Sequence, residues 1–163
     1  MALPSLPARN LDRIELEGLV DALALDIEQW RELVDFSDEK RVFVSLHRDD
    51  FIDVWLLCWT RENDTGWHDH DISSGAVRVI EGALSESSPR IAGQPTNRTV
   101  GAGEHFSFGP DHIHRLTGAR ESSVSIHAYS PPLWRLGQYA IDGDGVMRRQ
   151  SISYAEELRP LVA

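Results

Sequence analysis

Residues 66–82 read GWHDHDISSGAVRVIEG, and within them His68 and His70 stand two positions apart. Alternation along a β-strand places residues i and i+2 on one face, so both imidazoles can turn toward a single metal ion. The segment AVRVIEG that follows has the period of a strand and ends on the turn residue Gly82. A third ligand from a neighbouring strand would leave coordination positions open for a substrate, as in catalytic metal sites.

Further short strands are predicted on both sides of this stretch. Residues 42–46 alternate between two faces, and residues 51–60, FIDVWLLCWT, form a nearly continuous apolar strand. Strand-like segments separated by turn residues continue downstream: ALSESS, HFSF, HIHRLT, SVSIHAYS, GQYAID and VMRRQS. Short strands at such close spacing are typical of an all-β sandwich or barrel.

The ends of the chain have a different pattern. Residues 11–35 carry apolar side chains at roughly helical spacing, which predicts two short helices or one bent helix. We therefore expect a helical N-terminal arm over residues 1–38, packed on a barrel formed by residues 39–163. A short closing helix is predicted around Ser153–Leu158, because Ser153 can cap it with Glu156 three residues later.

Composition narrows the class of protein. The 163 residues carry a formal net charge of −10, which disfavours binding to nucleic acid or to an anionic membrane surface. Cys58 is the only cysteine, so the chain has no internal disulfide and no cysteine-rich zinc cluster. The N-terminal residues lack the pattern of a signal peptide, and we expect a cytoplasmic protein.

A second histidine pair follows in residues 103–114, which end in PDHIH. His112 and His114 are two residues apart and share a face, so spacing alone leaves both as candidates for the third ligand. His105 alternates on the strand HFSF, and we expect it to have a structural role.

A row of polar side chains lies further along, in SIHAYSPP, residues 125–132. Ser125, His127 and Tyr129 alternate on one strand face, so a hydroxyl, an imidazole and a phenol can form a hydrogen-bonded relay directed at the metal. A buried polar row of this kind is costly without a function.

These segments together resemble a known family. Residues 66–82 and 103–114 resemble the first and second cupin motifs, with Gly75 where many cupins have a ligating glutamate. The S-x-H-x-Y row followed by Ser-Pro-Pro, and the Cys58-Trp59 pair ten residues before His68, are similar to the cysteine dioxygenase family of thiol dioxygenases.

The resemblance implies a small double-stranded β-helix, or jelly-roll, barrel with N-terminal helices. It implies Fe(II) held by His68, His70 and His114, with a small thiol and dioxygen as substrates and a sulfinic acid as product. Ser125, His127 and Tyr129 would be the catalytic row. Some members join a cysteine of the first motif to this tyrosine through a thioether; Gly75 takes that cysteine's place, so Tyr129 is expected to be unmodified.

The sequence departs from the family at the substrate anchor. Members that act on cysteine hold its carboxylate with the arginine of a Y-x-R pattern, where this chain has Arg41, Val42 and Phe43. Residues 42, 44 and 46 are expected to face the barrel interior together with Arg48. Arg48 and Arg135 are therefore the preferred anchors, and Arg41 serves only if the register shifts. Phe43 and Trp59 would complete the substrate pocket.

Two other functions stay open. One is a cupin dioxygenase that acts on a ring or an enol, and the other is a non-catalytic cupin that binds a metal or a small molecule. The intact S-x-H-x-Y row favours a thiol dioxygenase, present as a monomer or homodimer.

Overall fold

The computed structural model describes residues 3–153. Its helical part consists of α1 (Arg13–Leu25) and two short 3₁₀ helices, η1 (Ile27–Gln29) and η2 (Arg31–Leu33). Eleven strands follow: β1 (Val42–Arg48), β2 (Asp53–Trp59), β3 (Trp67–Asp69), β4 (Ser74–Glu81), β5 (Ala83–Arg90), β6 (Gly93–Gly101), β7 (His105–Phe108), β8 (Arg115–Gly118), β9 (Ser123–Ser130), β10 (Arg135–Ile141) and β11 (Met147–Ser153).

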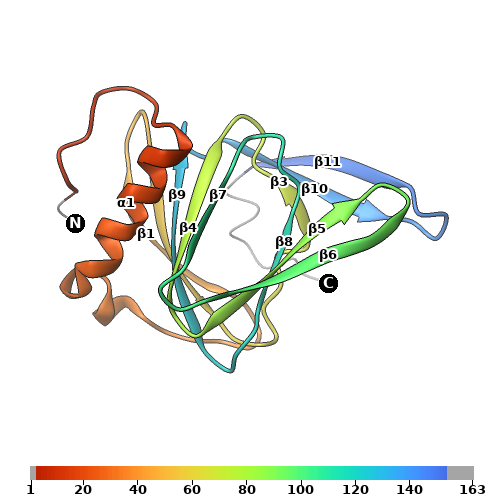
Figure 1. Cartoon of the computed structure of the whole chain (residues 1–163), viewed down its shortest axis with the longest axis horizontal. Coiled ribbons are helices and arrows are strands. Elements are labelled where there is room, and N and C mark those ends of the chain that lie inside the picture. The colour runs from red at the N-terminus through yellow and green to blue at the C-terminus, as the bar shows by residue number, and fades with distance from the viewer. Residues whose placement is uncertain (1–2, 154–163) are drawn as a thin grey trace.

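The strands form a cupin barrel from antiparallel sheets (Figure 1). A five-stranded sheet has the order β1-β2-β9-β4-β7, and two three-stranded sheets have the orders β11-β10-β3 and β6-β5-β8. Isolated bridges between His68 and His114, and between Asp64 and Thr117, join the two smaller sheets. The first histidine motif thus lies beside the second.

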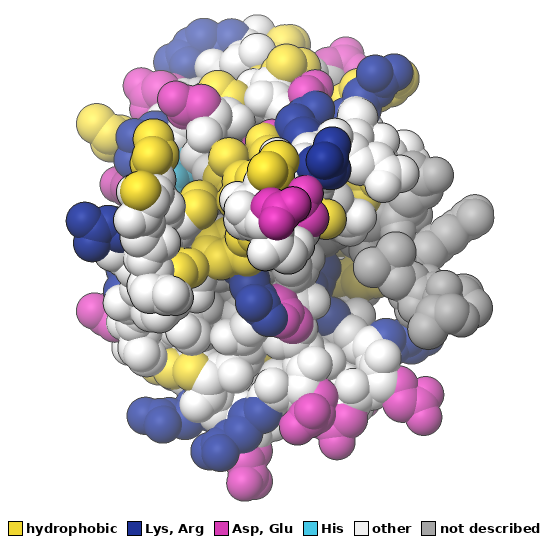
Figure 2. All heavy atoms as spheres, turned by 90° about the vertical axis from the view of Figure 1, so that its right-hand side faces the viewer, with side chains coloured by type: hydrophobic (Ala, Val, Ile, Leu, Met, Phe, Trp, Pro, Cys, Tyr) yellow, Lys and Arg dark blue, Asp and Glu magenta, His cyan; other side chains and the backbone are white. Residues whose placement is uncertain are grey.

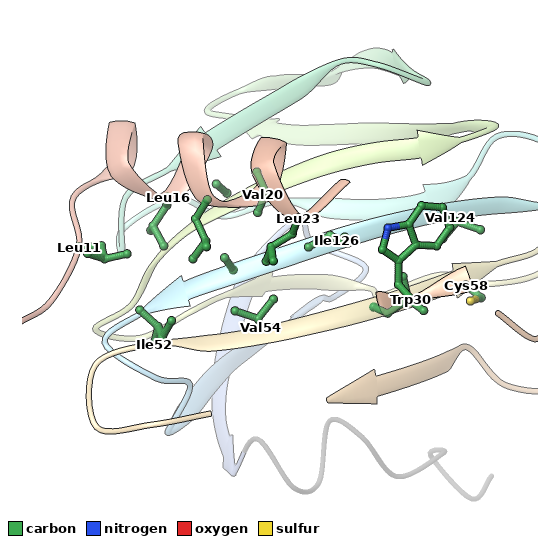
Figure 3. Packing of buried hydrophobic residues seen from close by; sticks show 14 residues of the cluster. Leu11, Leu16, Val20, Leu23, Trp30, Ile52, Val54, Cys58, Val124 and Ile126 are labelled. Atoms are coloured by element: carbon green, nitrogen blue, oxygen red, sulfur yellow. The ribbon is translucent and has the colours of Figure 1, made fainter. Parts of the chain in front are cut away.

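Helix α1 packs on the outer face of the five-stranded sheet, against β4, β9 and β7 (Figures 1 and 3). Asp12 begins it with a capping box, in which its side chain accepts from the Glu15 N–H and Glu15 reaches back to the Asp12 N–H. The helix buries a face of aliphatic side chains: Leu16, Leu19, Val20, Leu23 and Ala24. Figure 3 shows this face directed toward the strands.

After Asp53 at its start, strand β2 is apolar because the sheet is covered on both faces. Val54, Leu56 and Cys58 pack in the cluster under α1, whereas Trp55, Leu57 and Trp59 belong to the cluster inside the barrel. The sequence prediction of a nearly continuous apolar strand is confirmed, and alternation assigns each side chain to one of two cores.

The expected orientation of β1 is wrong. Val42, Val44 and Leu46 pack under α1, and Phe43 packs inside the barrel. A register shift between Ser45 and His47 then reverses the alternation of β1. Arg48 therefore pairs with Asp53, the first residue of β2. The two faces of this sheet are both apolar, so hydrophobic alternation alone did not distinguish them.

Two other strands differ from expectation. Strand β6 was not predicted; it is an edge strand that pairs with β5, and Gly93, Pro95 and Asn97 give it a weak strand propensity. Strand β8 begins at Arg115, later than HIHRLT suggested. The closing helix expected around 153–158 lies almost wholly outside the described residues. Within residues 3–153, no helix has the length and apolar character to span a membrane.

Candidate metal centre and pocket

The structure brings His68, His70 and His114 together inside the barrel. Their ring centroids are 4.7–5.2 Å apart, and one ligand nitrogen from each lies within 4.8 Å of the others. All three side chains are buried. His68 comes from β3, His70 directly follows it, and His114 precedes β8, so the bridge between the two histidine segments builds the cluster.

The hydrogen bonds of this cluster suit a metal ion. His68 Nδ1 lies 3.1 Å from the Gly66 carbonyl oxygen, and His114 Nδ1 lies 2.8 Å from a carboxylate oxygen of Glu86. These oxygens only accept, so both Nδ1 atoms carry the proton and both Nε2 atoms offer a lone pair. His114 Nε2 and His70 Nδ1 are buried with no hydrogen-bond partner among the described residues. A bound cation would satisfy such a nitrogen.

Burial keeps two of these imidazoles, those of His70 and His114, neutral. Burial lowers the pKa of His70 well below its ordinary value, and the neighbouring His68 adds to the effect. Burial also lowers the pKa of His114 to about 3, although the Glu86 hydrogen bond acts in the opposite direction. Neutral imidazole is the form that binds metals.

His112 is not a member of this group of three but lies beside it: its ring centroid is 5.0 Å from that of His114, and it forms a second candidate group with His114 and Glu86. Its Nε2 is 3.2 Å from Glu86, and its ring stacks on Phe108 at 5.6 Å. His105 contacts α1 instead, through Asp21 at 2.9 Å, as its expected structural role requires.

The polar row on β9 forms a hydrogen-bonded chain that begins at Trp59. The Trp59 indole N–H donates to Ser125 Oγ at 2.8 Å, Ser125 lies 2.9 Å from His127 Nε2, and His127 Nδ1 lies 3.1 Å from the Tyr129 hydroxyl. Sequence reasoning found the last three members but placed Trp59 only in the pocket wall.

The donors of this chain fix its direction. Indole can only donate, so Ser125 accepts from it and passes its own hydrogen to His127 Nε2. His127 then donates from Nδ1 to the phenol oxygen, which directs the Tyr129 O–H away from His127. Burial, followed by the charge of Arg41, lowers the pKa of His127 well below its ordinary value and so keeps the ring neutral.

Gly75 lies opposite Tyr129 across β4 and β9. A Cβ at Gly75 would lie 2.5 Å from the Phe108 ring and 3.0 Å from the Tyr129 ring. The missing side chain therefore makes room for both aromatic rings. Cys58 packs under α1 on the other face of the sheet, away from Tyr129.

One pocket joins the histidine cluster, the polar row and the inner face of β1 and β2. Its walls are mostly apolar and aromatic. They are formed by Arg41, Phe43, Trp55, Leu57, Trp59, Thr65, His68, His70, Leu116, His127, Tyr129, Leu133 and Leu136. Arg41 is the only lysine or arginine among these residues, and no aspartate or glutamate is among them.

The arginines differ from the expected ranking. Arg41 lines the pocket and lies with its guanidinium carbon 5.0 Å from the Trp59 ring centroid. Arg48 instead forms an ion pair with the buried Asp53 and donates to the Leu133 carbonyl at 2.8 Å. Arg135 is exposed at the start of β10. Neither Arg48 nor Arg135 lines this pocket, whereas Phe43 and Trp59 do.

A cluster of hydrogen bonds around Asp69 holds the segment that carries His68 and His70. Asp69, between the two ligands, accepts from Arg149 Nε at 2.8 Å, from the Tyr139 hydroxyl at 2.6 Å and from the Gly137 N–H at 3.0 Å. Burial would raise the Asp69 pKa, but these bonds hold it well below its ordinary value. These partners of Asp69 belong to the hairpin of β10 and β11, which projects from the barrel in Figure 1. Figure 2 views the same side of the molecule, where apolar side chains gather among charged ones.

The small antiparallel barrel is that of a cupin, and its buried group of three histidines could hold a metal ion. Solved structures agree on the fold. A cupin superfamily protein from Desulfitobacterium hafniense superposes with a TM-score of 0.54 at 10% identity, covering 80% of this chain and 98% of its own. An RmlC-like cupin protein from Desulfovibrio desulfuricans gives 0.53 at 15% identity, covering 61% and 90%.

The sequence identifies the family within this class. The profile of cysteine dioxygenase type I matches residues 6–141, and the chain belongs to that family. Cysteine dioxygenase type 1 from Homo sapiens and from Pongo abelii are each 24% identical to it over 131 residues. The match covers 72% of this chain but 64% of those relatives, so the chain spans somewhat less than two thirds of their length.

Proposed function

We propose that this protein is an Fe(II)-dependent thiol dioxygenase, which adds both atoms of dioxygen to the sulfur of a small acidic thiol and forms a sulfinic acid. The observation that carries the proposal is one pocket lined by His68 and His70 of the histidine group, by Tyr129 and by Arg41, with His114 beside the two other histidines. Membership of the cysteine dioxygenase type I family supports iron and a thiol. In this proposal the overall reaction balances as RSH + O₂ → RSO₂H.

His68, His70 and His114 would hold the iron, leaving positions for other ligands because, within residues 3–153, this group of three includes no carboxylate. Iron(II) bound there would supply a common site for thiolate and dioxygen and the electron transfer between them. The chain's own residues orient the reactants. Tyr129 presents its O–H on the side away from His127, and the apolar walls limit the access of water.

Arg41 would bind the carboxylate of the thiol. A guanidinium pairs with a carboxylate through two parallel charge-assisted hydrogen bonds, and the Trp59 ring supports it from below. Among the residues that the structure describes, the pocket walls hold no carboxylate to match an ammonium group. We therefore expect an acidic thiol to be preferred over an amine thiol of the same length.

The test is oxygen uptake by the iron-loaded protein. The thiols are 3-mercaptopropionate, L-cysteine and cysteamine, with the product identified by mass as the thiol plus two oxygen atoms. His114→Ala serves as the control without a complete ligand set. Sulfinate from 3-mercaptopropionate or cysteine, and little from cysteamine, is the expected result. Iron binding without oxygen uptake on any thiol would contradict the proposal and favour a non-catalytic cupin.

A ring or enol substrate is a second candidate. Phe43, Trp55 and Trp59 give one side of the pocket an aromatic wall, with Phe43 and Trp55 in edge contact at 5.8 Å between centroids. Oxygen uptake with an aromatic enol such as phenylpyruvate, together with none on thiols, would favour this function.

A further inference from the structure

The carboxylate of Glu86 lies directly behind one of the three histidines. Its Oε1 is 2.8 Å from Nδ1 of His114, and the side chains are 2% and 1% exposed. Glu86 occupies the middle of β5, between β6 and β8, where it stands opposite Leu116 on β8 and Arg98 on β6. The sheet thus places a buried anion against the outer nitrogen of a candidate ligand.

The two oxygens of this carboxylate have different partners. Oε2 accepts from Arg98 at 2.5 Å, and Oε1 faces both His114 and His112, the latter at 3.2 Å. The Arg98 guanidinium also lies over the Phe106 ring, 4.8 Å from its centroid. The Arg98 guanidinium therefore gives the buried Glu86 carboxylate a cationic partner, as a buried anion requires.

The three histidines differ in their outer partners. His68 Nδ1 faces a neutral backbone carbonyl at 3.1 Å, and His70 Nδ1 is without a partner among residues 3–153. His114 alone of the three faces a carboxylate. An anion behind a ligating imidazole fixes its tautomer and increases the electron density that it donates.

We propose that Glu86 is a positioning residue for the metal centre, which holds His114 with Nε2 toward the metal and increases its donation, while Arg98 offsets part of the carboxylate's charge. The inference rests on the three-histidine centre of the proposed function, but it does not depend on the substrate. It assigns a function to β6, whose Arg98 reaches the centre only through Glu86.

This arrangement predicts opposite effects of two neutralising changes. Removing the negative charge of Glu86 disfavours the more highly charged Fe(III) state, so the reduction potential of bound iron should become more positive. Removing the positive charge of Arg98 leaves the carboxylate less compensated, so the potential should become more negative. A residue that only packs the wall would not produce changes of opposite sign.

The variants are Glu86→Ala, Glu86→Gln and Arg98→Met. Glutamine keeps an acceptor for His114 and removes the charge, whereas alanine removes both. Arg98 is 57% exposed at its side chain, and methionine retains an aliphatic stem over Phe106. Exposed residues provide matched charge controls: Glu121→Gln in the turn before β9 and Arg90→Met at the end of β5.

Two measurements test the proposal on the full chain: Co(II) affinity by competition with a chelator, and the Fe(III)/Fe(II) potential by mediated titration. We expect Glu86→Ala to bind Co(II) roughly 10- to 100-fold more weakly. Glu86→Gln should bind more tightly than alanine and shift the potential upward, Arg98→Met should shift it downward, and both controls should match the wild type.

Wild-type affinity in Glu86→Ala and Glu86→Gln would overturn the proposal, as would shifts of the same sign in Glu86→Gln and Arg98→Met. If Glu86→Ala does not fold, the reduction potentials of bound iron in Glu86→Gln and Arg98→Met still test the proposal. A wild-type protein that binds neither Co(II) nor iron would instead contradict the proposed function itself.

Discussion

Replacing Arg41 by methionine should separate recognition of the substrate's acid from the chemistry at sulfur. Methionine keeps an aliphatic stem against the Trp59 ring and removes the guanidinium, which lies 5.0 Å from that ring's centroid. Hydrogen bonds to a charged partner contribute about 1.5–3 kcal/mol. At about 1.4 kcal/mol per factor of ten, their loss corresponds to a roughly 10- to 150-fold lower kcat/KM for an acidic thiol.

Most of this loss should be in KM, because Arg41 contacts the far end of the substrate and not the reacting sulfur. The variant should also keep a neutral His127, since burial is the larger cause of that residue's lowered pKa and the charge of Arg41 is the next. Removal of Arg41 raises the His127 pKa toward its ordinary value without removing the larger cause. The polar row therefore stays in the same protonation state.

The assay is steady-state oxygen uptake with 3-mercaptopropionate and with its neutral methyl ester. Arg41→Met should lose affinity for the acid and change little with the ester. Arg135→Met is the matched control, since Arg135 is exposed and does not line the pocket. An unchanged KM for the acid in Arg41→Met, or a large increase in Arg135→Met, would refute the assignment of the anchor.

Other changes test the remaining parts of the site. His114→Ala should lose bound iron while His112→Ala retains most of it, as measured by metal analysis of purified protein. Tyr129→Phe should keep iron and lower kcat by roughly 10- to 1,000-fold, the range for loss of one positioned proton donor. An unchanged kcat would show that the polar row on β9 has a structural role only. Arg149→Ala should destabilise the fold by about 1–2 kcal/mol in urea denaturation at pH 7, because Asp69 loses its ion pair. The folded-state pKa of Asp69 is depressed, so this stabilisation is present above the ordinary carboxyl pKa of about 4 and is lost as pH falls further; a difference between variants that stays constant down to pH 3 would contradict it.

Periodicity predicted the parts of the site that follow one strand. Alternation of Ser125, His127 and Tyr129 on β9 was sufficient to predict a hydrogen-bonded row, and the structure has that row with distances of 2.9 and 3.1 Å. The spacing of His68 and His70 likewise predicted convergent rings, which lie 4.8 Å apart. Such features depend on local backbone geometry, which a short segment of sequence specifies.

Periodicity could not determine which face of β1 lines the pocket. The aliphatic side chains of Val42, Val44 and Leu46 suit either a barrel interior or a surface covered by a helix, and α1 provides the latter. The choice depends on contacts with a helix that lies 17 or more residues earlier in the chain. The register shift after Ser45 then separates Arg48 from the face of Val42 and Val44, and Arg48 pairs with Asp53 instead of lining the pocket. Arg48 therefore does not line the pocket, whereas Arg41 and Phe43 do.

Two mostly polar strands, β6, which was not predicted, and β11, which was, hold the supporting charges of the centre. Strand β6 brings Arg98 to Glu86 behind His114, and β11 brings Arg149 to Asp69 beside the first histidine pair. In both cases a buried carboxylate adjoins a candidate ligand, and an arginine from an edge strand compensates its charge. A buried carboxylate without a cation would be costly. Each of these strands therefore supplies an arginine that compensates a buried carboxylate, although few of its own side chains are apolar. The barrel's inner residues place the three histidines, and the edge strands stabilise the anions that hold two of the histidine segments in position.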